Sequence, residues 1–200
     1  MTITPDTKDW TWVLQRPCPE CGFNTQGFPV EAVPGMIMAN AAAWPPALAG
    51  DARTRPEPGK WSPLEYGCHV RDVFRLYDQR LELMLSQNDP LFPNWDQDET
   101  AVADRYAEQD PAKVAAALHE SAQAIADRFE GVTGAQWQRT GRRGDGASFT
   151  VETFARYFIP DPVHHLYDVT GQRAVPPDRS ARLPDSRHVS VVVGDKGALG

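Results

Sequence analysis

The stretch "SPLEYGCHVRDVFRLYDQRLELMLSQ", Ser62 to Gln87, decides the fold of this chain. It opens with a serine, a proline and, three positions after the serine, a glutamate, which together form a capping box with the favoured proline of a helix N-terminus. Apolar residues then recur at helical spacing and form one stripe, made of Tyr66, Val70, Val73, Phe74, Tyr77, Leu81 and Met84. The pattern predicts a long amphipathic helix that ends near Gln87.

A second helical pattern precedes this stretch. It runs from Pro34 to Leu48, and the adjacent Pro45 and Pro46 should make its last turn irregular or end the helix early. After the long helix, a short helix is expected around residues 98–107, within the acidic segment "NWDQDETAVADRYAEQDP".

Two more helices are predicted in the second half of the chain. One begins at Asp110 and Pro111, a cap followed by a proline at the first helical position, and the last begins near Ser148 or Thr150. The glycine-rich segment 131–148 between them is interpreted as a loop with some extended structure. Long helical patterns without a series of alternating strands predict an all-α fold, namely a four-helix bundle.

The chain divides into three parts. Residues 28–170 are predicted to form the bundle, residues 1–27 an N-terminal arm that carries "CPECG", and residues 171–200 a mostly disordered, irregular tail. Within the tail, "HVSVVV" at 188–193 is a candidate short strand. A length of 200 residues suits one domain with a single core.

Composition and charge exclude several classes of protein. Hydrophobic residues make up 41% of the chain and charged residues 24%, as in soluble globular proteins. The formal net charge of −7 argues against a general binder of nucleic acid or of membrane surfaces, because such proteins need clustered Lys and Arg. The chain has no transmembrane-length apolar run and no signal-peptide pattern at its N-terminus. We therefore expect a cytoplasmic protein.

The chain has three cysteines, Cys18, Cys21 and Cys68, an odd and small number that argues against a disulfide framework. In Cys18-Pro-Glu-Cys21-Gly22, two cysteines separated by two residues have the form of a zinc knuckle, and the glycine permits the tight turn that follows. A closed structural zinc site needs four ligands, and this motif offers two. A redox dithiol and a pair of ordinary unligated cysteines are the alternatives.

Three of the five histidines suggest a metal site. His69 lies on the flank of the apolar stripe of the long helix and should point into the bundle or its mouth. His164 and His165 are adjacent, so on a helix they face directions about 100° apart and one of them can face the core. Bundle cores build metal sites from inward side chains on facing helices, and zinc or nickel accepts imidazole nitrogen. The alternative for His69 is a buried neutral histidine with hydrogen-bond partners for both ring nitrogens.

Three blocks of the sequence carry a family resemblance: "WSPLEYGCHVRDV" at 61–73, "NWDQDETAVADRY" at 94–106 and "FTVETFARYFIPDPVHHLYDV" at 149–169. They resemble the DinB-like superfamily, and more narrowly an actinobacterial branch of it, over residues 9–169. The resemblance implies a four-helix bundle that binds a divalent metal, usually through one histidine on the second helix and two, four residues apart, on the last. Related members include thiol-dependent S-transferases and a mycothiol-dependent maleylpyruvate isomerase, in which the metal activates the thiol of a low-molecular-weight cofactor.

The resemblance matches His69 to the second-helix ligand and His164 to the last ligand. The remaining ligand should stand at position 160, where this chain has Pro160, which offers no ligating atom. Two kinds of side chain can replace this missing third ligand. One is the carboxylate of Asp161. The other is the pair of knuckle thiols, which would form a Cys2His2 site with His69 and His164 or would be completed by Cys68.

Two prolines, Pro160 and Pro162, interrupt the last helix just before the histidine pair. Asp161–Pro162 has the signature of an N-cap followed by a proline at the first helical position. The helix should therefore stop near Phe158 or Ile159 and restart at Asp161, or else run through with a kink. An aspartate that caps the restarted helix is unavailable as a metal ligand.

Arg142 and Arg143, which stand among glycines, are candidate contacts for an anionic cofactor, with a solvated basic turn as the alternative. The predicted function is that of a metal-binding bundle, a mycothiol-dependent S-transferase or isomerase that takes small electrophiles and a thiol as partners. A catalytically inactive bundle of the family, metal-stabilised or metal-free, is the alternative. Dimerisation through a helix face stays open.

Overall fold

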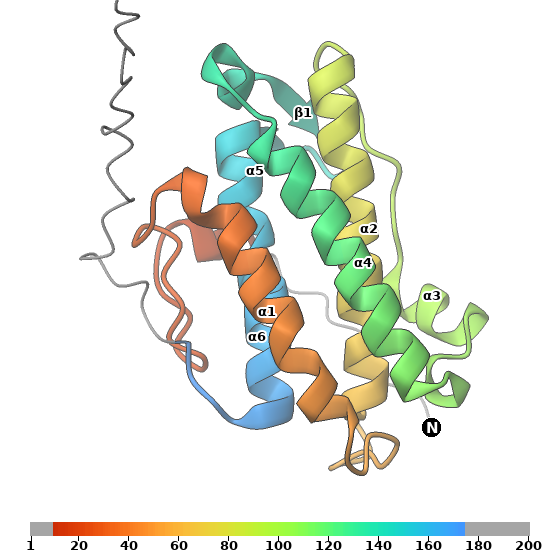
Figure 1. Cartoon of the computed structure of the whole chain (residues 1–200). Helices are drawn as coiled ribbons and strands as arrows, with labels where there is room; N and C mark the ends of the chain where they lie inside the picture. The colour runs from red at the N-terminus through yellow and green to blue at the C-terminus, as the bar shows by residue number, and fades with distance from the viewer. Residues whose placement is uncertain (1–9, 175–200) are drawn as a thin grey trace, which may run out of the picture.

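Four helical rods make up the body of the molecule in the computed structural model, which describes residues 10–174 (Figure 1). Three of the rods are α1 (Val33–Leu48), α2 (Pro63–Ser86) and α4 (Pro111–Glu130), and the fourth is divided into α5 (Val151–Phe158) and α6 (Pro160–Thr170). α4 packs against α1 and α2, and α6 packs against the same two helices. The predicted all-α, four-helix bundle is confirmed.

Short elements connect the rods. α3 (Gln97–Ala103) and a 3₁₀ turn at Tyr106–Glu108 take the place of the single short helix expected at 98–107. The glycine-rich segment forms a small antiparallel hairpin of β1 (Thr140–Arg142) and β2 (Ser148–Thr150). Further 3₁₀ turns lie at Trp10–Leu14, Val30–Ala32 and Gly134–Gln138. The candidate strand at 188–193 lies outside the described residues, within which no helix is both long and apolar enough to cross a membrane.

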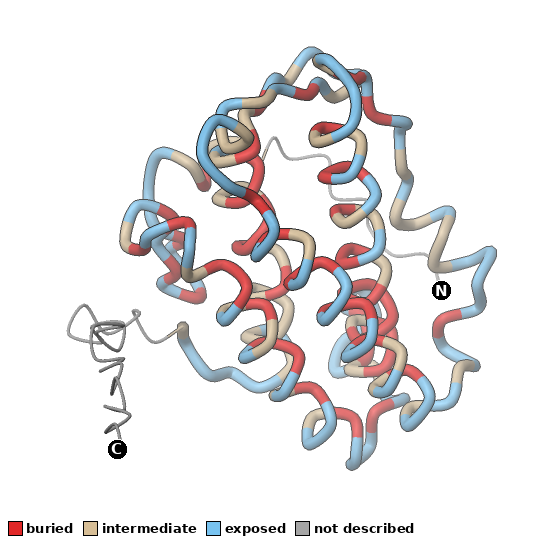
Figure 2. The backbone as a smooth tube through the Cα atoms, turned by 45° about the horizontal axis from the view of Figure 1, so that its top comes forward, coloured by how far each residue is buried: buried red, intermediate tan, exposed pale blue. Residues whose placement is uncertain are grey.

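The core lies between the rods, where buried positions form stripes along the inward faces of the helices (Figure 2). The largest fully buried aromatic side chains come from several elements: Trp44, Phe74, Tyr106, Phe129, Phe154 and Phe158. The stripe predicted on α2 is buried from Val70 to Met84, whereas Tyr66 is half-buried and packs against the ring of His165. The apolar pattern of α2 therefore sets which face of the helix meets the bundle.

α1 continues through Pro45 and Pro46 to Leu48, so neither proline ends it early. Each proline removes one backbone donor from the last turns of the helix. Trp44 and Leu48 are both buried in this region, and their core contacts hold the last turn in place despite that loss.

The joint between α5 and α6 is a single residue, Ile159, which keeps a right-handed helical conformation. Pro160 is the first residue of α6, a position where the missing N–H of proline costs little. The helix thus restarts one residue earlier than the expected cap at Asp161. No side chain caps α6, so the carboxylate of Asp161 is not used in capping.

The capping box of α2 is expected to stabilise the protein measurably. Ser62 Oγ accepts a hydrogen bond from the Glu65 N–H (3.3 Å), and Glu65 Oε2 accepts one from the Ser62 N–H (2.8 Å). We expect Ser62→Ala to lower the free energy of unfolding by about 1 kcal/mol, since loss of a cap typically costs that much. Denaturant unfolding checks this beside Ser62→Gly, which should cost only a few tenths of a kcal/mol. An alanine variant as stable as the wild type would contradict the expectation.

Candidate metal centre

His69 of α2 points into the bundle, and its side chain has no exposed surface. Its ring stacks on Trp95 with 5.6 Å between centroids, and the ring of Trp61 lies 5.2 Å away. Both ring nitrogens are buried without a hydrogen-bond partner among the described residues. A buried neutral histidine normally has partners for its donor and its acceptor nitrogen. The alternative of a core histidine satisfied by hydrogen bonds therefore does not describe this ring.

Asp161 and His165 of α6 face His69 from the opposite side. Asp161 Oδ1 lies 3.5 Å from His69 Nε2 and 3.8 Å from His165 Nε2. The rings of His69 and His165 meet edge to face with 4.8 Å between centroids. One ligand atom from each of the three residues lies within 4.8 Å of the others. Asp161 and His165 are four positions apart, so they project from the same face of α6.

These three side chains fit a divalent metal ion. Ligand atoms held at about 2.0–2.2 Å from a tetrahedral ion are about 3.3–3.6 Å apart. The separation between His69 Nε2 and Asp161 Oδ1 is 3.5 Å, which is long for a hydrogen bond, and both atoms are buried without a hydrogen-bond partner in the described part of the chain. A metal ion bound between them would satisfy both atoms.

Burial and local charge set the protonation states of His69 and Asp161. Burial lowers the pKa of His69, so the ring is neutral and keeps a lone pair for a metal. Burial by itself raises the pKa of Asp161, but the nearby His165 and His69 rings outweigh it, and the net pKa lies below the ordinary value. The group therefore combines a neutral imidazole with an ionised carboxylate.

Asp168 supports His165 from the next turn of α6. Its Oδ2 lies 3.1 Å from His165 Nδ1, which leaves Nε2 on the side of Asp161. A carboxylate on the second nitrogen of a metal-binding histidine fixes the tautomer and the ring orientation. Tyr66 packs on the same ring with 5.0 Å between centroids. His165 is therefore held in an orientation suited to a ligand.

A cavity of about 520 Å³ borders this group. Its volume lies within the range of about 300–1,000 Å³ that small-molecule pockets have. Asp161 and His165 form part of its wall, which also includes Trp95 and Arg80, while the fully buried His69 lies behind them. A small molecule in the cavity can therefore reach the candidate ligands.

The two arginines predicted to contact an anionic cofactor lie in different places. Arg143 belongs to the cavity wall, donates a hydrogen bond to the Tyr157 hydroxyl (2.7 Å) and pairs with Asp145. Arg142 is not part of the wall and pairs with Asp89 at 2.7 Å. Arg143 is thus the one of the pair that a molecule in the cavity can meet.

Arg80 is a further cationic residue of the cavity. It is 7% exposed, and its guanidinium lies over the rings of Phe92 and Tyr77 at 5.5 and 5.8 Å. One Nη atom donates to the Pro93 carbonyl (3.2 Å), while Nε is buried without a hydrogen-bond partner among the described residues. Burial accordingly lowers the pKa of this guanidinium. The cavity wall therefore holds a positive charge that is only partly satisfied.

His164 does not join the His69 group. Adjacent residues of a helix face about 100° apart, and the His164 ring turns toward the N-terminal segment, where its Nδ1 lies 3.5 Å from Cys18 Sγ. Two groups form where a single site was expected: His69 with Asp161 and His165, and Cys18 and Cys21 with His164. The family resemblance places the two ligands of the last helix at positions 160 and 164. The pair that faces His69 stands one residue later, at Asp161 and His165. Cys68 joins neither group and lies buried near the Tyr106 carbonyl.

Sequence reasoning named His165 as one of the histidine pair but gave the ligand role to His164, and it missed Asp168 and Arg80 as site residues. The signal for His165 was its spacing of four residues from Asp161, because residues four apart share a helix face. Asp168 follows His165 by three residues and lies within the same reach. Arg80 belongs to the cavity through tertiary packing against Phe92, which the local sequence does not indicate.

Comparisons with known proteins agree with this fold. A solved structure described as "YfiT from Bacillus subtilis is a probable metal-dependent hydrolase with an unusual four-helix bundle topology" is similar with a TM-score of 0.59 and 17% identity, covering 85% of this chain and 91% of that chain. At that identity the likeness supports the fold alone. No curated protein matches the chain at a significant level. Residues 40–169, well over half of the chain, match the sequence profile of the DinB superfamily, and this protein belongs to that family.

Proposed function

We propose that this protein is a divalent-metal-dependent enzyme that acts on a small molecule, with the metal bound by His69, Asp161 and His165. The observation that carries the proposal is the pair formed by His69 Nε2 and Asp161 Oδ1, two buried atoms 3.5 Å apart for which residues 10–174 provide no hydrogen-bond partner. Each unsatisfied buried group costs about 1–3 kcal/mol, a cost that a bound cation removes. Zinc or nickel suits this set of nitrogen and oxygen donors.

Hydrolysis is the reaction that this centre favours. A divalent cation in such a site lowers the pKa of a bound water toward neutrality and so supplies a nucleophile. His69 is held neutral by burial and need not lose a proton to act as a ligand. Asp168 engages Nδ1 of His165 and keeps Nε2 on the metal side. The Bacillus subtilis protein of similar fold is described as a probable metal-dependent hydrolase, which agrees with this assignment.

The cavity favours a substrate with an anionic group. Arg80 places a buried guanidinium on the wall, and its Nε has no hydrogen-bond partner among the described residues. Hydrogen bonds between a guanidinium and a carboxylate or phosphate are stronger than those between neutral groups. A substrate carboxylate or phosphate beside the Arg80 guanidinium would be held by its positive charge.

Thiol transfer is the second candidate function, with a low-molecular-weight thiol such as mycothiol as cofactor and a small electrophile as substrate. The observation that favours it is the cavity volume of about 520 Å³, which has room for more than a very small substrate. The thiolate is the reactive form of a thiol, and a cation at the His69 site would stabilise it as it would hydroxide. We place this chemistry in the cytoplasm, where thiols stay reduced.

Metal titration of the purified protein tests the proposal. The measurement uses the Cys21→Ser background, so that the neighbouring cysteine group does not contribute. We expect one zinc or nickel ion to bind per chain, and Asp161→Ala to weaken binding by at least about 100-fold, because even the loss of an outer-shell partner costs about 10–100-fold. The loaded protein should cleave chromogenic esters, carboxylate-bearing ones faster than neutral ones. Consumption of mycothiol and an electrophile without ester cleavage would favour the second candidate.

Asp127→Ala is the matched control, since Asp127 is an exposed aspartate of α4 outside both candidate groups. This variant should bind metal as the wild type does. A folded Asp161→Ala protein with unchanged metal affinity would contradict the proposed centre, whatever its activity.

A further inference from the structure

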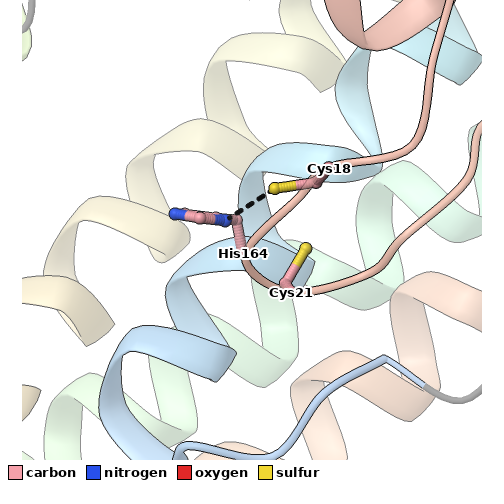
Figure 3. A group of neighbouring side chains, drawn as sticks. All are labelled: Cys18, Cys21 and His164. Carbon is pink, nitrogen blue, oxygen red and sulfur yellow. Dashed lines mark hydrogen bonds between the residues drawn. The ribbon is translucent and has the colours of Figure 1, made fainter.

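Cys18 and Cys21 lie at the two ends of a tight turn closed by backbone hydrogen bonds. The Gly22 N–H donates to the Cys18 carbonyl (2.9 Å), and the Cys18 N–H donates to the Phe23 carbonyl (2.8 Å). Gly22 has a φ of +79°, a left-handed conformation that residues with a side chain rarely adopt. Both cysteines are buried, and their thiols lie near each other beside the His164 ring (Figure 3). The backbone thus presents two sulfur atoms together.

His164 of α6 completes a group with these two thiols (Figure 3). Its Nδ1 lies 3.5 Å from Cys18 Sγ, and one atom from each of the three residues lies within 4.8 Å of the others. In a tetrahedral site with Zn–S near 2.3 Å and Zn–N near 2.0–2.1 Å, a sulfur and a nitrogen ligand are about 3.5–3.6 Å apart. The observed separation equals that of two ligands of one zinc ion.

The other ring nitrogen of His164 faces carboxylates. Its Nε2 lies 3.6 Å from Glu20 Oε2 and 3.7 Å from Asp168 Oδ1. A carboxylate beside Nε2 favours the tautomer that carries its proton there, which leaves the lone pair of Nδ1 for a metal. The second oxygen of Asp168 lies 3.1 Å from His165 Nδ1. Asp168 therefore stands between the two groups and supports one histidine of each.

We propose that Cys18, Cys21 and His164 bind a zinc ion at a second centre, separate from the His69 site. Two thiolates and an imidazole are ligands that zinc prefers and that magnesium or calcium does not. Each thiol releases its proton to solvent as it binds the ion. Cys18 and His164 border the cavity, so the fourth coordination position is accessible to a water or a small ligand from that side.

The proposed ion links segments that are far apart in the sequence. Cys18 and His164 are separated by 146 residues. The chain after α6 also packs on the cysteine turn, where Arg173 donates to the Pro19 carbonyl (3.0 Å) and the Ala174 N–H donates to the Cys21 carbonyl (2.9 Å). Zinc would thereby tie the N-terminal segment to the last helix beside the cavity.

The surroundings of the cysteines do not suit the redox alternative. A reactive dithiol typically lies at the N-terminus of a helix, which stabilises the thiolate. Cys18 and Cys21 lie in a turn, and the next helical element begins only at Val30. No helix N-terminus therefore follows the two cysteines directly to stabilise a thiolate. A bound zinc ion would supply the positive charge instead.

Cobalt binding by the full-length protein tests the second centre, because Co²⁺ reports the type of its ligands. Thiolate ligands give an intense sulfur-to-cobalt charge-transfer band in the near ultraviolet, whereas imidazole and carboxylate ligands do not. We expect the band in the wild type to disappear when zinc displaces the cobalt. In Asp161→Ala, where the other centre is disabled, the band should saturate at one equivalent per chain. Cys21→Ser should reduce the band to about half or less, since one of two thiolates is lost, and His164→Ala should weaken cobalt binding by at least about 10-fold.

Three variants serve as controls. Cys68→Ala and His119→Ala change a cysteine and a histidine outside the group and should keep the band. Asp161→Ala should also keep it, since that variant disables the other centre alone. If the wild-type protein binds cobalt without showing the band, the proposal is overturned. This test uses the wild type alone and does not depend on the folding of any variant. A band that keeps its full intensity in Cys21→Ser overturns it as well.

Discussion

Replacing His69 by leucine is expected to remove the metal-dependent stabilisation of the bundle. A ligand that binds only the folded state stabilises it by about 2.7 kcal/mol when its free concentration is 100 times the Kd. In a protein of this size, 1 kcal/mol changes the Tm by about 2–4 °C. The protein with His69 should therefore melt about 5–11 °C higher with zinc than with a chelator, as followed by circular dichroism, and the leucine variant should show no such difference.

The same substitution is expected to have a different effect when metal is removed. His69 buries two ring nitrogens that have no hydrogen-bond partner within residues 10–174, and such groups cost about 1–3 kcal/mol each. Leucine fills a similar volume without polar atoms. After chelation, His69→Leu should melt at the same temperature as the parent protein or higher, so the metal decides which of the two is more stable.

Both measurements belong in the Cys21→Ser background, which disables the proposed thiolate centre. His119→Leu is the matched control, because His119 is an exposed histidine of α4. It should keep the full response to zinc. A His69→Leu protein that is clearly less stable than its parent after chelation would contradict the description of His69 as an unsatisfied group.

Most of the fold could be predicted because its signals are local. The capping box at Ser62 and the apolar stripe that follows predict α2 close to its observed bounds, Pro63–Ser86. The cap at Asp110 predicts the start of α4 in the same way. The β1–β2 hairpin is different, since each strand has three residues, too few to show an alternating pattern.

The site could be predicted only in part, because its geometry depends on the direction in which each side chain of α6 faces. Sequence reasoning named His69, Asp161 and the knuckle cysteines as candidate ligands, but it placed His164 beside His69. Adjacent residues of a helix face directions about 100° apart, so only one of His164 and His165 can face His69. In the structure His165 meets His69, and His164 meets the cysteines.

Phe158→Ala is expected to be strongly destabilising. Phe158 has no exposed surface, stacks on Tyr77 with 4.6 Å between ring centroids, and meets Phe74 edge to face at 5.9 Å. Removal of a buried phenylalanine side chain typically costs about 3–5 kcal/mol, which corresponds to a fall in Tm of about 6–20 °C here. Denaturant unfolding measures the loss. Val102→Ala is the control, since Val102 is 79% exposed and its truncation should change stability by no more than about 0.5 kcal/mol.

The effect of Phe158→Ala should also reach the candidate metal centre. Phe158 is the last residue of α5, and only Ile159 and Pro160 separate it from Asp161. A side chain that anchors this joint in the core fixes the direction in which α6 leaves it, and hence the position of the Asp161 carboxylate relative to His69. Zinc affinity at the His69 site should therefore fall in Phe158→Ala at temperatures well below its Tm, while Phe158→Leu, which keeps most of the volume, should retain it. Wild-type affinity in the alanine variant would mean that the contacts of α6 with α1 and α2, not the joint, hold the ligands in place.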